Sequence, residues 1–149
     1  MKVKDLLEES AGHFHTIEQD QSVAKALKIM SGYNTSALVV MTQTASQGIF
    51  TERDLVRCHI IFPDKDIKDI LIKDVMTSKL IVADPGDSIE DAMGMMITAK
   101  IRHLPIVEQN KIKGMLSLED LVKEHVNVLN KELHYLQDYI SDLQDAAND

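Results

Sequence analysis

The length, composition and charge of the chain exclude several classes of protein. Its 149 residues suit one domain or two half-domains that share a core, and 44% apolar residues can fill that core. The formal net charge of -8 argues against general nucleic-acid binding, which depends on neutralising phosphates with Lys and Arg. One Cys permits no internal disulfide, and no apolar run has signal-peptide or membrane-spanning length. We therefore expect a soluble cytoplasmic protein that does not enter a membrane.

The first half of the chain predicts a β-α-β-β-α order. Hydrophobic periodicity separates the helices from the strands, Ser22 is a predicted N-cap, and Gly32 is the predicted helix end. We expect a helical lead-in at 3–7, a strand at 13–17, a helix at 23–31, strands at 37–41 and 47–50, and a helix from Thr51 to about Ile60.

The second half predicts the same order after a charged linker. Its helix should bury one apolar face, formed by Ile89, Ala92, Met93, Met96 and Ile97. We expect a strand at 80–82, a turn at 85–87, a helix at 88–100, strands at 104–107 and 112–116, and a helix from Ser117 onward.

An internal repeat with an offset of 66 residues explains this similarity. Gly48 and Gly114, Thr51 and Ser117, and Asp54 and Asp120 are all separated by 66 positions, and the lead-in matches with an offset larger by three. A repeat sets the fold before any other feature does. The predicted units are repeat 1 at 1–62, a linker at 63–71, repeat 2 at 72–127 and a helical extension at 128–149. Each unit has one open sheet face, which pairing of the repeats would bury.

The repeated element Ser/Thr-x-x-Asp has two interpretations. Thr51 with Asp54, and Ser117 with Asp120, could form capping boxes at the starts of the two helices. The same groups could also bind a nucleotide, because a helix N-terminus offers N–H donors to phosphate and a carboxylate accepts from ribose hydroxyls.

These motifs resemble those of the tandem CBS-domain family, also called the Bateman module. The similarity covers roughly residues 1–127 and rests on four segments, which are, in chain order, GIFTERDLV, VMTSKLIVADPGDSIEDAM, IRHLPIV and GMLSLEDLV. It implies an α+β fold of two β-α-β-β-α repeats about a pseudo-twofold axis, with two clefts between them. It also implies a regulatory module, not an enzyme, that binds an adenosine-containing ligand: AMP, ADP, ATP or S-adenosylmethionine.

The resemblance assigns candidate binding residues one at a time. Asp120 and Ser117 match the ribose acid and the hydroxyl, and Asp54 and Thr51 match them in repeat 1. Arg102 and His103 match phosphate-facing positions, so we expect affinity for phosphates to fall from about pH 6 to 8 as His103 loses its proton. Residues before each first strand match adenine-lining positions, and these are Gly12 to Phe14, Lys79, Leu80 and Ile81.

Repeat 1 departs from this pattern. Ser36 and Ala37 stand where Arg102 and His103 stand in repeat 2, so both basic groups are missing. Arg53 or Arg57 could substitute for them. We therefore expect the Ser117/Asp120 site to bind phosphorylated adenosines more tightly than the Thr51/Asp54 site does.

The last helix has a heptad seam with apolar steps of 4 and 3 residues, formed by Val122, Val126, Leu129, Leu133, Leu136, Ile140 and Leu143. It could fold back on its own domain, or pair with another copy in a homodimer or with a protein partner through residues 128–149. Catalytic and metal-binding motifs are absent from the sequence. The alternative to nucleotide sensing is therefore a ligand-free interaction module that acts through this helix.

Overall fold

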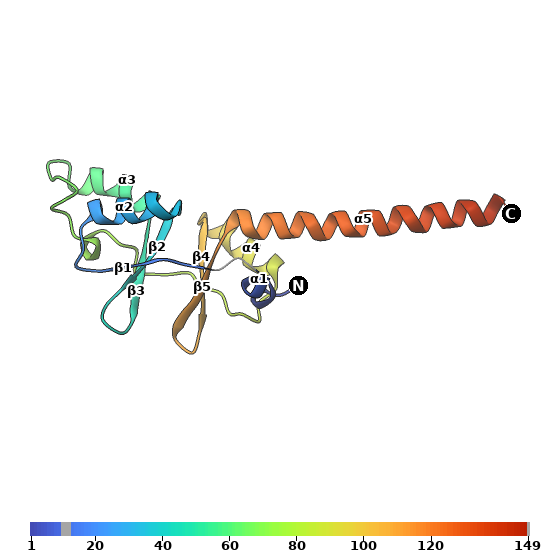
Figure 1. The fold of residues 1–149 in the computed structure, drawn as a ribbon, viewed down its shortest axis with the longest axis horizontal. Coiled ribbons are helices and arrows are strands. Elements are labelled where there is room, and N and C mark those ends of the chain that lie inside the picture. Colours follow the sequence, from blue (N-terminus) through green and yellow to red (C-terminus); the bar gives the residue numbers. More distant parts are fainter. Residues whose placement is uncertain (10–12, 149) are drawn as a thin grey trace.

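The structure is a computed structural model that describes residues 1–9 and 13–148 (Figure 1). A body of short strands and helices carries one helix that extends far beyond it. The elements in chain order are α1 (Val3–Glu9), β1 (Thr16–Glu18), α2 (Val23–Tyr33), β2 (Ala37–Met41), β3 (Ser46–Thr51), α3 (Glu52–Ile61), the 3-10 helix η1 (Ile72–Asp74), α4 (Ile89–Ala99), β4 (His103–Glu108), β5 (Lys111–Ser117) and α5 (Leu118–Asn148).

Repeat 1 folds into a three-stranded sheet in the order β1-β2-β3. β1 pairs with β2 in parallel and β2 pairs with β3 antiparallel. Alternate residues of β2 face opposite sides. Leu38 and Val40 join a core with buried residues of α2 and α3, whereas Ala37 and Val39 join a cluster with residues of repeat 2. β2 is thus buried on both faces, as its continuous apolar run requires.

Repeat 2 has a smaller sheet, in which β4 and β5 pair antiparallel. The predicted strand at 80–82 is wrong, because the pairing is made one residue later, by a single parallel bridge between Ala83 and Ile106. Ile81 and Val82 are 42% and 40% exposed, so the apolar run itself is not a core strand. Ile97 was also expected inside, yet it is 62% exposed.

The predicted end of α2 also needs correction. The helix continues through Gly32 to Tyr33, and Asn34 ends it in the left-handed conformation with φ of 52°. Asn tolerates this region better than most residues. Lys100 ends α4 in the same conformation, with φ of 57°, and lies 66 residues after Asn34.

The lead-in segments are exchanged between the repeats. Val3 and Leu6 of α1 pack into the core of repeat 2, where the Val3 N–H donates to the Asp87 carbonyl at 2.9 Å. Ile72 and Val75 pack into the core of repeat 1. Each packed unit therefore consists of one repeat and the lead-in segment of the other repeat. The two units cannot separate without breaking both cores.

The open sheet faces of the two repeats pack against each other, as the sequence predicted. Ala37, Val39 and Ile49 from repeat 1 meet Met115 from repeat 2, with Phe14 at the edge. The contact between the units is thus apolar and closes the core of the body.

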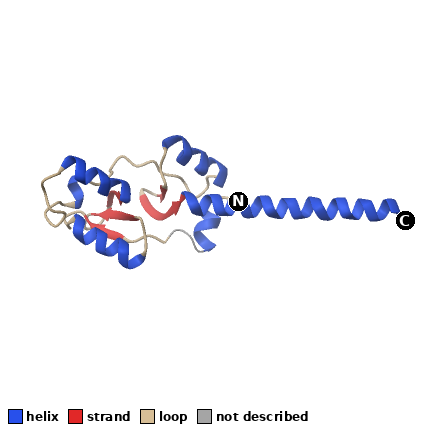
Figure 2. Cartoon of the chain, turned by 90° about the horizontal axis from the view of Figure 1, so that it is seen from above, coloured by secondary structure: helices blue, strands red, loops and turns tan. Residues whose placement is uncertain are grey.

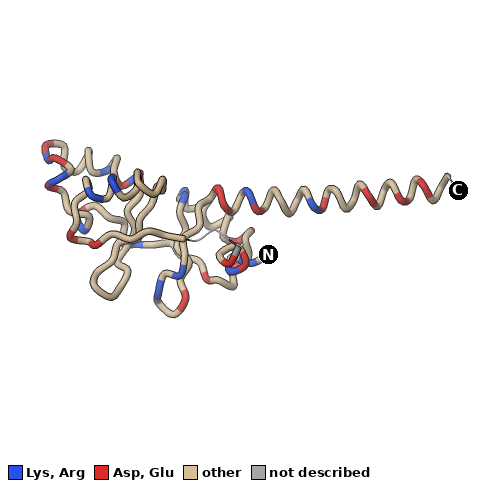
Figure 3. The backbone as a smooth tube through the Cα atoms, viewed as in Figure 1, with Lys and Arg blue, Asp and Glu red and all other residues tan. Residues whose placement is uncertain are grey.

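Helix α5 leaves the body and extends as a single rod (Figures 1 and 2). Leu121 is its one buried residue, so the fold-back interpretation of the heptad seam is wrong. Positions occupied by charged residues recur along the rod (Figure 3). Within the described residues, helices long enough to cross a bilayer are too polar to do so.

Candidate functional site

A cleft of about 860 Å³ lies between the two repeats. This volume is typical of small-molecule sites. Repeat 1 lines it with residues 13–14, 34–37 and 52, and repeat 2 lines it with residues 102–103, 115, 117–120 and 122–123. The cleft thus brings the start of β2 close to the start of β4 and to the first turn of α5.

The first turn of α5 is held by a reciprocal capping box. The Ser117 N–H donates to Asp120 Oδ2 at 3.0 Å, and the Asp120 N–H donates to Ser117 Oγ at 3.1 Å. The Leu118 N–H donates to the Arg102 carbonyl at 2.9 Å, which fixes Arg102 beside the helix start. Because these N–H groups already have partners, a phosphate at this end would depend on side-chain charge more than on the helix terminus.

His103 connects the two repeats across the cleft. Its Nε2 lies 2.7 Å from Ser36 Oγ. Burial lowers the pKa of His103 from its ordinary value; nearby Glu52 opposes this effect, and the cation of Arg102 adds to it. Burial thus moves the proton loss of His103 toward lower pH, and the expected fall in phosphate affinity between about pH 6 and 8 stays a prediction.

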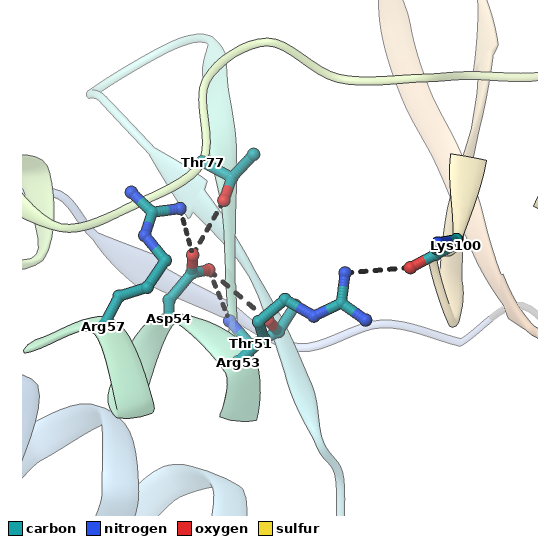
Figure 4. Close-up of polar contacts among 6 residues, drawn as sticks. All are labelled: Thr51, Arg53, Asp54, Arg57, Thr77 and Lys100. Carbon is teal, nitrogen blue, oxygen red and sulfur yellow. Dashed lines mark hydrogen bonds and ion pairs between the residues drawn. The ribbon is translucent and has the colours of Figure 1, made fainter.

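The matching acid in repeat 1 has a different environment (Figure 4). Asp54 is only 1% exposed. Its Oδ1 accepts from Thr77 Oγ1 at 2.8 Å and from Arg57 Nη1 at 3.2 Å, and its Oδ2 accepts from the Thr51 N–H at 3.0 Å. Both oxygens are occupied by protein donors, so Asp54 ties α3 to the exchanged segment that contains Thr77.

A second contact distinguishes the two sides of the module. Arg53 Nη1 donates to the Lys100 carbonyl at 2.8 Å and thereby joins α3 to the end of α4 (Figure 4). The residues 66 positions away from this pair are Glu119 and Asn34, and both line the cleft. A carboxylate cannot donate to a carbonyl, so the corresponding bridge cannot form there. The cleft side therefore has no equivalent of the hydrogen bond that Arg53 makes to Lys100 on the opposite side.

The structure brings four of the nine predicted binding residues to this cleft: Arg102, His103, Ser117 and Asp120. It does not bring five others to it, and their role in binding stays a prediction: Thr51, Asp54, Lys79, Leu80 and Ile81. His13 and Phe14 line the cleft, whereas Gly12 lies outside the described residues.

Sequence reasoning missed Asn34, Thr35 and Glu52 as cleft residues. The 66-residue offset contained the signal for Asn34, because a pseudo-twofold pairing places the end of α2 opposite the first turn of α5.

The charges around the cleft nearly balance. Glu52, Glu119 and Asp120 supply three carboxylates, and Arg102 and Lys123 supply two permanent positive charges. With His103 neutral, the cleft has no excess of positive charge to offer a strongly anionic ligand.

Comparisons with known proteins agree with this architecture. Residues 3–60 and 72–127 each match the family profile described as CBS domain. CBSX3, a mitochondrial CBS domain-containing protein of Arabidopsis thaliana, is 37% identical over 126 residues, which are 81% of this chain and 61% of that relative. The match therefore spans less than two thirds of the relative's length.

Solved structures share the fold. The crystal structure of the CBS domain NE2398 superposes with a TM-score of 0.79 at 36% identity, covering 85% of this chain and 98% of that one. CBSX2, crystallised in complex with AMP, gives a TM-score of 0.70 at 21% identity, covering 85% and 97%, and this likeness shows the fold alone. Tandem repeats, exchanged lead-ins and an inter-repeat cleft thus occur in a chain that belongs to the CBS domain family.

Proposed function

We propose that the chain is a regulatory module that binds one adenosine-containing nucleotide in the cleft between its repeats. The observation that carries this proposal is the contrast between two acids in the same motif. Asp54 is buried and satisfied by protein donors, whereas Asp120 is half-buried at an 860 Å³ cleft beside Arg102. Asp120 makes its capping bond through Oδ2, which leaves Oδ1 to accept from ribose hydroxyls.

The other roles follow from position. Arg102 is the cation that meets a phosphate, since a guanidinium makes paired hydrogen bonds to phosphate oxygens. Phe14, at the edge of the inter-repeat cluster, offers an apolar surface to the base. His103 is uncharged near neutral pH in this assignment and acts as a hydrogen-bonding partner.

The charge balance favours a monophosphate over a triphosphate. Two permanent cations face three carboxylates, so each further phosphate adds negative charge that the cleft does not neutralise. AMP is therefore the proposed ligand ahead of ADP and ATP. The complex of the structurally similar CBSX2 with AMP supports this choice.

Calorimetry and thermal melts with adenosine, AMP, ADP, ATP and S-adenosylmethionine test the proposal. A ligand at 100 times its dissociation constant adds about 2.7 kcal/mol to the free energy of unfolding. Asp120→Ala should abolish the effect of AMP. Asp91→Ala is the matched control, because Ser88 and Asp91 form the same Ser-x-x-Asp element at the start of α4, outside the cleft.

A second variant separates ribose from phosphate recognition. Arg102→Gln should weaken AMP by about one to two decades, the value of a charge-assisted hydrogen bond, and should leave adenosine almost unaffected. A complete panel without any melting shift would overturn the nucleotide proposal and favour a ligand-free interaction module.

A further inference from the structure

Beyond the body, α5 exposes a continuous apolar seam. Its seven residues, from Val122 to Leu143, are between 41% and 54% exposed. The rise of an α-helix makes this segment about 32 Å long. A helix of this length in water gains most of its stability from packing of an apolar face, and this face has no partner among the described residues of the chain. The seam is therefore available for packing against a second surface.

We propose that α5 pairs with α5 of a second copy of this chain as a parallel, two-stranded coiled coil. This inference goes beyond the proposed nucleotide function and does not depend on it. The seam assigns Val126, Leu133 and Ile140 to heptad position a, and Val122, Leu129, Leu136 and Leu143 to position d.

The residue types at these positions specify the number and direction of the helices. β-Branched side chains at a, combined with Leu at d, favour parallel dimers. Here Val126 and Ile140 occupy two of the three a positions, and Leu occupies three of the four d positions. Ile at both a and d, or Leu at a with Ile at d, would favour trimers or tetramers. This seam has neither pattern, because it has no Ile at d.

The charges on α5 allow a like-charged helix to approach. Figure 3 shows acidic residues along the rod, but the heptad places most of them away from the seam: Glu124, Asp138 and Asp145 at position f and Asp142 at position c. In a parallel pair, Glu132 at position g faces the neutral Gln137 of the other helix at position e. Two copies can thus associate without like charges meeting along the interface.

The body leaves this seam accessible. Leu121, which packs in the core of repeat 2, lies at position c, away from the a and d edge, whereas His125, 3.9 Å from Glu90 of the body, lies at position g and flanks that edge. A second helix can therefore lie along Val122 and Val126 while Leu121 stays in the core of repeat 2.

Light scattering on the full chain tests self-association. The expected mass is twice the 16.7 kDa of one chain. The double variant Leu129→Asp/Leu136→Asp should give single chains. The matched double variant Asn127→Asp/His134→Asp adds the same charges at the outward position b and should stay dimeric. Both target leucines are about half exposed, at 48% and 54%, so the body should keep its fold, which circular dichroism would verify. A wild-type monomer, a larger oligomer or a dimeric seam variant would overturn the proposal.

Cysteine cross-linking tests the direction of the pair. Leu143→Cys lies at position d near the far end of the rod, and a parallel pair brings its two copies together, so mild oxidation should give a covalent dimer. Ser141→Cys at the outward position b is the control and should not cross-link. The native Cys58 does not interfere, because it is fully buried and burial raises the pKa of its thiol. A dimer that Leu143→Cys fails to cross-link would be antiparallel and would overturn the assignment.

Discussion

Replacing Asp54 by alanine tests the structural role of the acid in repeat 1. The variant removes the acceptor of the Thr77 hydroxyl at 2.8 Å and of the Thr51 N–H at 3.0 Å. The charged hydrogen bond to Thr77 contributes about 1.5–3 kcal/mol, and the helix cap about 1 kcal/mol. Arg57 is 47% exposed, so screening limits its ion pair to at most about 1 kcal/mol. The total loss of unfolding free energy is about 2.5–5 kcal/mol.

This loss should appear as a large fall in melting temperature. For a chain of this size, 1 kcal/mol corresponds to about 2–4 °C, so Asp54→Ala should melt about 5–20 °C below the wild type. Asp120→Ala removes a more exposed cap alone and should lower the melting temperature by about 2–4 °C. Thermal unfolding of the ligand-free proteins, followed by circular dichroism, measures both. Equal shifts in the two variants would refute the reasoning that Asp54 holds the junction between α3 and the exchanged segment.

Three further predictions follow from the same geometry. Truncation after Asn127 should give single chains in light scattering and change the melting temperature little, because the cores end at Leu121; a sharp fall in melting temperature would show that the tail is part of the core. Since burial lowers the pKa of His103, the unfolded chain takes up this proton first as pH falls below about 6.5, so stability should decrease there and His103→Gln should reduce that decrease in denaturant titrations. AMP calorimetry should give one site per chain, because Asp54 and Arg53 are already engaged, and two sites would contradict this asymmetry.

The sequence predicted most of the fold because its strongest signals are local. Ser22 caps α2 as predicted, and Ser88, where a helix start was predicted, caps α4, since an N-cap depends on the next three residues alone. The 66-residue offset located the pairs of equivalent residues and the sheet faces that meet. The strand expected at 80–82 failed because three consecutive apolar residues do not show which of them has a pairing partner.

The candidate site could be predicted only in part, because its asymmetry arises from distant contacts. Thr51-x-x-Asp54 and Ser117-x-x-Asp120 have the same spacing, yet only Asp54 binds Thr77. Thr77 precedes repeat 2 in sequence but packs on repeat 1. Arg53 meets Lys100 across 47 residues of sequence. The sequence could reveal that Glu119 replaces Arg53, but only the folded chain shows that this exchange lies beside the open cleft.

Helix α5 belongs to both proposed interfaces, so we expect binding at the cleft and pairing at the seam to be linked thermodynamically. Ser117 and Asp120 contribute its first turn to the cleft, and Val122 both lines the cleft and begins the seam. A ligand that orders the first turns lowers the entropy cost of ordering the same helix in a dimer, so AMP should tighten self-association.

This coupling between AMP binding and dimerisation must be reciprocal. The factor by which AMP lowers the dimer dissociation constant equals the factor by which dimerisation lowers the dissociation constant of AMP, typically about 5–150-fold. Sedimentation equilibrium with and without saturating AMP measures the first factor, and calorimetry on the wild type and on Leu129→Asp/Leu136→Asp measures the second. A dimer constant unchanged by AMP would mean that the cleft and the seam act independently, although one helix carries both.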